Sequence, residues 1–179
     1  MGNRLASFIL SLIVLIALCG YATNAAASSG ERELKLKAGF VVRFLSYVKK
    51  GNDESLRSIC VYGDDSVRVA FEPALKSKTS RPNLSLLHNP ISPLKCEVVF
   101  ISEHYEGSLA SILRSARGNP ILTIGDGQEF LRQGGMIRFF EKERKLKFEV
   151  NLSAATREGL FISSQLLRLA LMYKEEHED

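Results

Sequence analysis

The sequence lacks the short motifs that mark the common classes of enzyme. It contains no Gly-x-Ser-x-Gly nucleophile elbow, no His-Glu-x-x-His zinc helix, no phosphate-binding glycine-rich loop with its lysine, and no Gly-x-Gly-x-x-Gly after the first predicted strand. Its three histidines, His88, His104 and His177, are separated from one another and from the cysteines, which disfavours a metal site. We therefore predict no catalytic residues, no metal and no cofactor, and we do not expect an enzyme.

Basic residues form no cluster in this chain. The 24 Lys and Arg against 20 Asp and Glu give a formal charge of +4, and these residues are spread along the 179-residue sequence. A protein that binds nucleic acid is expected to gather its basic residues on one face or in one stretch. Nucleic acid is therefore not predicted as a partner, and the length favours a single compact domain.

The chain also lacks an apolar run long enough to anchor it in a membrane. The run from Phe8 to Leu18 has about 11 residues, whereas a spanning helix needs about 20. Arg4 precedes this run and small residues with an Ala25-x-Ala27 pattern follow it, which is typical of a secretory signal peptide cleaved after Ala27. A lipid anchor at Cys19 is disfavoured, because lipoprotein cleavage normally requires a small residue in place of Leu18.

Cysteine is scarce, with three in the whole chain. Removal of a leader over residues 1–27 leaves only Cys60 and Cys96. An even number of cysteines in an exported chain predicts a disulfide between them. The bridge could serve as a structural staple or as a redox-sensitive switch, and the sequence leaves both open.

Hydrophobic periodicity predicts the order of helices and strands. The apolar stripe that includes Leu36, Phe40 and Phe44 predicts a first helix over residues 32–50, with Lys35, Lys37 and Arg43 on its other faces. Further predictions are buried strands at 57–63, 96–101 and 121–124, a weaker strand at 84–88, a helix at 109–116, a hairpin at 134–150 and a helix at 162–173. A helix after residues 64–66 should be broken or delayed by Pro73, which has no amide hydrogen.

This order of elements predicts an α/β fold. We expect a single domain over residues 28–173, with a mainly parallel sheet and flanking helices, followed by a frayed polar tail at 174–179. The hairpin should extend the sheet in the antiparallel sense, and the last helix should close it.

Three aspartates follow predicted strands. Asp64 and Asp65 come after the strand at 57–63, and Asp126 comes after the strand at 121–124. The carboxyl ends of parallel strands meet at one edge of a sheet, where ligands of such folds bind. Helix capping and turn formation explain the same residues without a ligand. A ligand-binding edge and a purely local role both remain open.

Several segments of the sequence together resemble one known family. The likeness covers residues 34–173, and its most specific parts are Leu122-Thr-Ile-Gly-Asp126, Gly134-Gly-Met-Ile137, Lys147-Phe-Glu-Val-Asn-Leu152 and Ile162-Ser-Ser-Gln-Leu-Leu-Arg-Leu-Ala170. These segments are similar in order and spacing to the YfiR/HmsC-like family of small periplasmic proteins. Two features differ from the family. Val48 is followed by Lys-Lys-Gly in place of a Trp-Pro pair, and residues 133–140 carry no second cysteine pair.

The resemblance implies a regulatory role. Family members bind the periplasmic sensor domain of an inner-membrane diguanylate cyclase and repress it, which lowers cyclic-di-GMP and biofilm formation. The resemblance also allows two further partners: an outer-membrane lipoprotein that sequesters the protein, and a second copy of the chain in a homodimer. The predicted partner-binding residues are Glu149 first, then Leu152 and Ala155, with Arg138 and Arg168 as secondary candidates; Glu149 could equally be an exposed strand residue. The alternative function is a periplasmic small-ligand binding module that uses the carboxyl edge of the sheet.

Overall fold

The computed structural model describes residues 29–51, 54–76 and 85–174. The chain divides into two units, residues 1–34 and 35–179. The predicted leader at 1–27 lies outside the described residues, as does nearly all of the predicted tail. Among the described residues, none of the helices has the length and apolar character needed to cross a bilayer.

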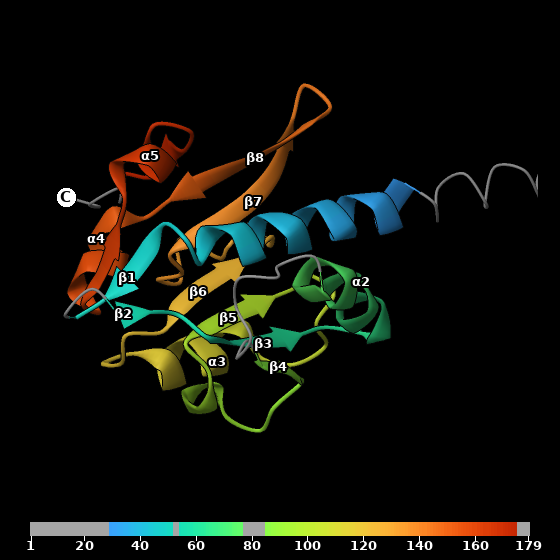
Figure 1. Ribbon diagram of the computed structural model, residues 1–179, viewed down its shortest axis with the longest axis horizontal. Helices are drawn as coiled ribbons and strands as arrows, with labels where there is room; N and C mark the ends of the chain where they lie inside the picture. Colours follow the sequence, from blue (N-terminus) through green and yellow to red (C-terminus); the bar gives the residue numbers. More distant parts are fainter. Residues whose placement is uncertain (1–28, 52–53, 77–84, 175–179) are drawn as a thin grey trace, which may run out of the picture. The chain divides into compact units, whose positions relative to one another are not determined.

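A seven-stranded sheet forms the centre of the second unit, in the order β10-β8-β7-β6-β5-β3-β4 (Figure 1). Strands β4, β3, β5, β6 and β7 are parallel, β8 is antiparallel to β7, and β10 is parallel to β8. The predicted α/β class with a mainly parallel sheet is confirmed. The strands are Ser58–Tyr62 (β3), Ser85–His88 (β4), Val98–Ile101 (β5), Leu122–Gly125 (β6), Ile137–Lys142 (β7), Lys145–Val150 (β8) and Leu171–Met172 (β10).

A second, three-stranded sheet has the order β2-β1-β9 and is antiparallel throughout. Its strands are Val48–Lys50 (β1), Glu54–Ser55 (β2) and Leu160–Ile162 (β9). The ammonium group of Lys50 in β1 pairs with the Glu97 carboxylate, which lies directly before β5. This ion pair joins the small sheet to the large one.

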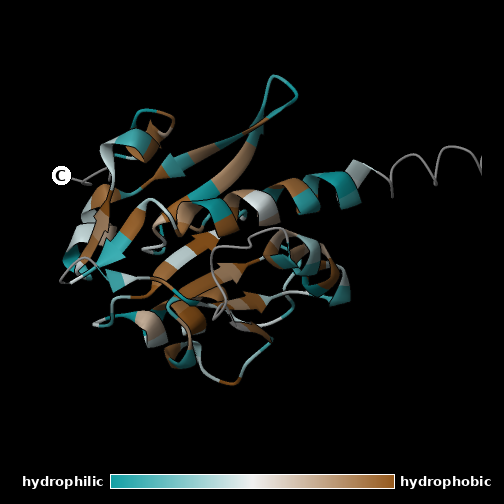
Figure 2. Ribbon diagram, in the orientation of Figure 1, coloured by the Kyte–Doolittle hydropathy of each residue, from teal (hydrophilic) through white to brown (hydrophobic). Residues whose placement is uncertain are grey.

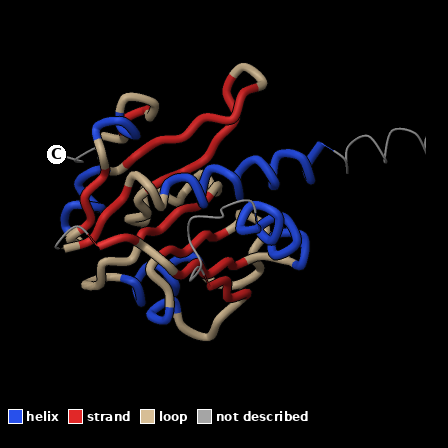
Figure 3. The backbone as a smooth tube through the Cα atoms, in the orientation of Figure 1, coloured by secondary structure: helices blue, strands red, loops and turns tan. Residues whose placement is uncertain are grey.

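The first helix precedes β1, and the later helices lie in the connections between the strands (Figure 3). Residues 29–44 are helical, and the later helices are Asp65–Lys76 (α2), Leu109–Ala116 (α3), Leu152–Arg157 (α4) and Ser164–Leu167 (α5), with a short 3-10 turn at Pro93–Lys95 (η1). Hydroxyl side chains begin two of them. Ser108 Oγ accepts from the Ser111 N–H at the start of α3, and Ser163 Oγ accepts from the Leu166 N–H at the start of α5, which satisfies amide groups that have no partner within the helix.

One face of the sheet packs against α2 and against the end of the first helix at Phe44. Phe44 stacks on Phe139 of β7 with ring centroids 5.8 Å apart and also contacts Phe148 of β8 at 5.0 Å. Phe71 of α2 packs on Phe100 of β5 at 5.4 Å. Burying each phenyl ring contributes about 2 kcal/mol. The central strands are accordingly hydrophobic, whereas the tip of the β7–β8 hairpin is hydrophilic (Figure 2).

The opposite face packs against α3. Its buried cluster joins alternate residues of β3 and β5, including Cys60 and Val99, to Ile112 and Leu113 of α3 and to Phe130 in the turn after β6. Since successive strand residues point to opposite faces, the central strands are buried on both sides.

The first helix is shorter than predicted. It ends at Phe44, residues 45–47 form a turn, and Val48–Lys50 is strand β1. The amides of Ser46 and Tyr47 bond to the carbonyls of Arg43 and Phe44, which tightens the end of the helix. Pairing of β1 with both β2 and β9 then outweighs the helical periodicity of the sequence.

The predicted break at Pro73 is wrong, because α2 runs through it from Asp65 to Lys76. Pro73 leaves the carbonyl of Val69 without its helical donor. Both residues lie on the exposed side of the helix, so water can reach that carbonyl.

The predicted helix at 162–173 is also wrong in extent. Ile162 ends strand β9, α5 covers only Ser164–Leu167, and Leu171–Met172 is strand β10. The Tyr173 amide donates to the Val150 carbonyl of β8 at 2.9 Å. The longer helix does not form, because β9 pairs with β1 and β10 pairs with β8.

Candidate partner-binding surface

Arg138 and Glu149 form a cross-strand ion pair on the β7–β8 hairpin. They lie directly opposite each other in the sheet register. Arg138 Nη2 and Nε donate to Glu149 Oε2 at 2.8 and 3.1 Å, and Nη1 donates to the Gln128 carbonyl at 3.4 Å. The guanidinium also lies 5.3 Å from the centroid of the Phe140 ring. The two predicted residues are therefore together, and neither is an isolated charge.

The hairpin reaches this register through a tight turn. Glu143 and Arg144 both have positive φ, 54° and 59°. A two-residue turn with this conformation matches the twist of paired strands. The turn places Arg138 and Glu149 near the base of the hairpin, where each side chain keeps about a fifth of its surface exposed, 20% and 23%.

Apolar side chains are exposed beside this pair, at the edge of the sheet. Leu171 of β10 is the neighbour of Glu149 in the register. Leu171 and Met172 are each 47% exposed, and Leu169 directly before β10 is 74% exposed. Edge strands with exposed apolar residues are surfaces on which other chains can pack.

The remaining predicted partner residues have different surroundings. Leu152 opens α4 and is half-buried, whereas Ala155 has no exposed surface. Asn151 begins this helix by accepting a hydrogen bond from the Ala154 N–H at 2.9 Å. Arg168 is exposed at the end of α5. Ala155 can act on a partner only by setting the position of α4, while Leu152 and Arg168 can make contact.

The three aspartates of the predicted carboxyl edge take part in separate local contacts. Asp126 accepts from Lys37 Nζ and from the Glu103 N–H, both at 2.6 Å, and the Lys37 and Asp126 side chains are only 9% and 5% exposed. Asp64 accepts from the Ser66 side chain and from the amides of Ser66 and Val67. These bonds, the one from the Ser66 hydroxyl above all, hold the pKa of Asp64 below its ordinary value.

Asp65 lies in the first turn of α2 with its side chain 85% exposed. No group of three His, Cys, Asp or Glu residues suited to a metal ion occurs within residues 29–51, 54–76 and 85–174. Asp64 thus caps α2, Asp126 forms a buried ion pair, and Asp65 lies 3.8 Å from Arg68 Nε at the surface. A shared ligand role for the three stays a prediction.

The partner of Asp126 was not predicted. The sequence pattern predicts Lys37 on the polar side of the first helix, but the residue is only 7% exposed. Its spacing to Val41 and Phe44 puts it on the same buried stripe as those residues. That spacing is the feature of the sequence that could have predicted the burial of Lys37, since a lysine on an apolar stripe indicates a buried acidic partner.

The Lys50–Glu97 pair alters the protonation of both side chains. The hydrogen bond from Lys50 to Glu97 raises the pKa of Lys50, and this outweighs the opposing effect of burial. Burial acts to raise the pKa of Glu97, but the hydrogen bonds from Lys50 and from the Arg57 amide together lower it. The charged forms of both residues are favoured in the folded protein.

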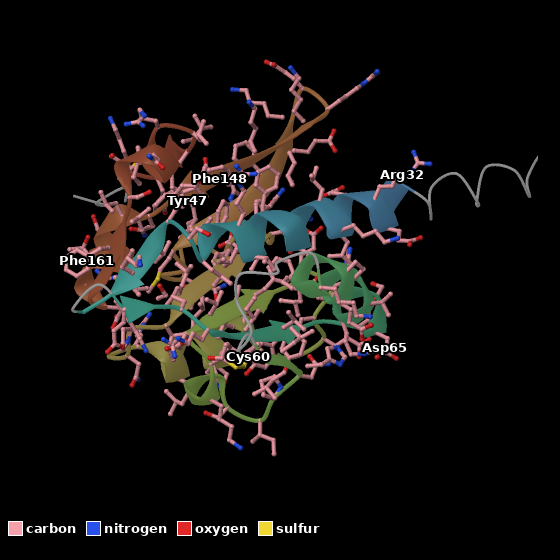
Figure 4. All side chains as sticks on the ribbon, viewed as in Figure 1. Arg32, Tyr47, Cys60, Asp65, Phe148 and Phe161 are labelled. Atoms are coloured by element: carbon pink, nitrogen blue, oxygen red, sulfur yellow. A yellow bond between two sulfur atoms is a disulfide. The ribbon has the colours of Figure 1, made fainter. Side chains whose placement is uncertain are left out.

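The predicted disulfide between Cys60 and Cys96 is confirmed (Figure 4). Its Cα atoms are 5.7 Å apart, and it joins β3 to the residue at the end of η1 across a sequence separation of 36. Both cysteines are buried in the cluster beneath α3. A disulfide of this kind fits an oxidising compartment.

The YfiR/HmsC-like family model matches residues 34–171. The chain belongs to the YfiR/HmsC-like family. The match includes the hairpin, the exposed apolar residue Leu171 and both bridged cysteines, so the predicted family is confirmed.

Solved structures share the fold at low sequence identity. A conserved domain protein from Vibrio cholerae O1 biovar El Tor is 14% identical with a TM-score of 0.54, over 79% of this chain and 60% of that one. The ABC domain from Streptococcus pneumoniae, solved in complex with L-Trp, is 10% identical with a TM-score of 0.56, over 75% and 59%. The chain thus spans about 60% of these proteins, and the likeness establishes the fold alone.

Proposed function

We propose that the protein is a periplasmic regulator that binds the periplasmic sensor domain of an inner-membrane diguanylate cyclase and represses the enzyme. Family membership over residues 34–171 is the observation that supports this most. The Cys60–Cys96 disulfide agrees with an oxidising compartment. Repression would lower cyclic-di-GMP and, with it, biofilm formation.

The physical basis is differential binding. A partner shifts the equilibrium of the cyclase only by the difference between its affinities for the inactive and active states. Moving a population from almost all active to almost all inactive requires a difference of about 10⁴-fold. The protein must therefore present a surface that fits one state of the sensor domain much better than the other.

The surface that we assign to this role consists of the Arg138–Glu149 pair and the exposed Leu169, Leu171 and Met172. The apolar residues supply area that can be buried, and the ion pair lies beside them with about a fifth of each side chain exposed. Interfaces commonly combine an apolar centre with a polar rim. Leu152 and Arg168 are further candidate contact residues, and Ala155 can act only through the position of α4.

Deleting the gene should raise cyclic-di-GMP, and Glu149→Lys should raise it nearly as much. The substitution places a second positive charge opposite Arg138 and removes the negative charge from the surface. Glu141→Lys is the matched control, because Glu141 is an exposed carboxylate near the tip of the same hairpin. Unchanged cyclic-di-GMP in the deletion strain, or an equal rise with Glu141→Lys at equal protein levels, would contradict the proposal.

A charge swap separates a structural role for the pair from a role at the interface. Arg138→Glu combined with Glu149→Arg restores an opposite-charge pair within the hairpin but exchanges the two charges on the surface. If the pair only holds the strands together, the double variant regains repression. We expect it to recover stability and to remain derepressed.

The partner itself can be captured from membranes with the tagged exported protein. Inner-membrane fractions should yield a cyclase, and outer-membrane fractions should yield any lipoprotein that sequesters the regulator. Running both captures with and without reductant distinguishes the two roles left open for the disulfide. Loss of capture in reductant, without unfolding, would favour a redox switch over a structural staple. Equilibrium sedimentation of the same protein would reveal a homodimer.

A further inference from the structure

A pocket lies on the α3 side of the sheet, separate from the proposed partner surface. Its volume is about 300 Å³, and hydroxyl groups dominate its polar lining: Tyr62, Tyr105, Ser108, Ser111 and Ser115. This volume is at the lower end of the range for small-molecule sites. The pocket can therefore take only a small ligand.

The topology of the sheet explains why a pocket forms there. From β3 the chain passes through α2 to β4, and from β5 it passes through α3 to β6, so the two connections run in opposite directions from adjacent strands. Their helices cover opposite faces, since α2 packs on Phe100 and α3 packs over Cys60 and Val99. Open α/β sheets bind ligands at such a switch point, beyond the carboxyl ends of the strands. Tyr62 is the last residue of β3.

The phenol group of Tyr62 is an unsatisfied polar group in the wall of this pocket. Only 2% of its surface is exposed, and its phenol oxygen is buried without a hydrogen-bond partner. A buried hydroxyl without a partner costs free energy that a bound ligand can recover. Burial, and then the nearby Tyr105, raise the pKa of Tyr62 to about 12, so the group remains a neutral hydroxyl that can donate or accept.

The loop between β5 and α3 holds Tyr105 against Tyr62. The two rings meet edge to face with centroids 5.3 Å apart. Gly107 leaves room for the Tyr105 phenol, because a Cβ at Gly107 would lie 2.4 Å from its oxygen. Any other residue at 107 would displace the ring, so the loop is built around this pair of tyrosines.

The described lining of the pocket carries no charged side chain. An anionic or cationic ligand would lose its hydration there without gaining a partner. Serine and tyrosine hydroxyls can each donate and accept hydrogen bonds, and the rest of the wall includes Pro90, Pro93 and Ile112. This combination suits the alternating hydroxyl and C–H groups of a polyol. We propose that the pocket at Tyr62 and Tyr105 binds a neutral, hydroxyl-rich small molecule of about monosaccharide size.

Calorimetry on the exported protein tests this with defined probes. D-glucose and myo-inositol are the neutral probes, gluconate and glucose 6-phosphate are their charged counterparts, and uracil is a neutral planar probe. We expect saturable binding of at least one neutral polyol and binding of gluconate, glucose 6-phosphate and uracil that is at least about tenfold weaker. No saturation by either polyol up to about 20 mM overturns the proposal, as does equal or tighter binding of a charged probe or uracil.

Two variants locate the site. Tyr62→Phe removes an oxygen that has no partner in the free protein, so the fold is kept while binding weakens at least about fivefold. Ser115→Tyr places a large side chain in the pocket and should abolish binding. Tyr47→Phe is the control, since Tyr47 is half-buried and lines a different groove. Polyol affinity equal to wild type in either Tyr62→Phe or Ser115→Tyr overturns the assignment of the site. This outcome does not depend on whether the protein regulates a cyclase.

Discussion

The parallel half of the large sheet and its antiparallel end use their charged side chains differently. Beside the parallel strands, Asp126 is almost fully buried against Lys37, and Asp64 caps α2. At the antiparallel end, Arg138 and Glu149 pair with each other while about a fifth of each side chain stays exposed. Leu171 next to them is also open to solvent.

Connectivity accounts for this difference. Parallel strands need crossover connections, and the helices in those connections cover both faces of the sheet. The step from β7 to β8 needs only a two-residue turn, so this connection adds no helix beside Arg138 and Glu149. The surface that we propose for the partner lies where the sheet changes from parallel to antiparallel. Four predictions, in order of decreasing effect, test that contrast.

The disulfide should contribute the largest share of stability, and it lies in the parallel half. Replacing both Cys60 and Cys96 by Ser should lower the free energy of unfolding by about 4 kcal/mol, since the bridge closes a loop of some 36 residues in the unfolded chain. Urea unfolding followed by circular dichroism measures this. Reductant should have no further effect on the double variant, and a loss below about 1 kcal/mol would contradict the prediction.

Removing the buried carboxylate should come next. Asp126→Ala removes the buried carboxylate that accepts from Lys37 Nζ, and it removes the acceptor of the Glu103 amide. We expect a loss of about 3 kcal/mol. Asp65→Ala should cost less than about 0.5 kcal/mol, because Asp65 is exposed. Similar losses for the two variants would show that the buried pair has no special role.

The Lys50–Glu97 pair should make stability depend on pH at both extremes. Folding lowers the pKa of Glu97, so its contribution is complete above the ordinary value of 4.5 and is lost as pH falls through the lower, folded value. Folding raises the pKa of Lys50, so its contribution is complete below 10.5 and is lost as pH rises through the higher, folded value.

Glu97→Gln should therefore cost about 1 kcal/mol at neutral pH and flatten the acid limb of the stability profile. Melting temperatures measured across the acid range test this, with exposed Glu141→Gln as the control. An acid limb of unchanged steepness in Glu97→Gln would show that another group is responsible.

The smallest effect on stability should come from the exposed edge. Leu171→Asp should change the free energy of unfolding by less than about 0.5 kcal/mol, yet it should reduce capture of the membrane partner at least about tenfold. Leu87→Asp is the matched control, because Leu87 is 38% exposed on β4, the opposite edge of the same sheet. Equal capture by both variants would remove the antiparallel end as the partner surface.

Local patterns predicted those elements whose hydrogen bonds and apolar contacts are close in sequence. Helix α3 occupies the predicted residues Leu109–Ala116, and the hairpin turn at Glu143 and Arg144 falls within the hairpin predicted at 134–150. Strands β3, β5 and β6 appear where continuous apolar runs predicted buried strands. The resemblance placed Arg138 and Glu149 on one candidate surface, but only the register brings them into contact.

Elements that depend on distant partners could not be predicted in this way. Strand β1 has helical spacing but pairs with β9, more than a hundred residues later. Strand β10 is two residues long and exists because β8 lies beside it. A backbone segment with weak local preference takes the structure that satisfies its amide and carbonyl groups, and that depends on its neighbours in space.

The sequence by itself thus determined the family, the α/β class, the cysteine pair and the candidate residues of the hairpin. Tertiary structure alone decided that Asp126 is neutralised by Lys37, that Ala155 is inaccessible, and that the Tyr62 hydroxyl lies buried without a partner. The reason is physical. Periodicity reports which face of an element is apolar, whereas the burial and pairing of a polar group depend on elements that the chain brings together only when it folds.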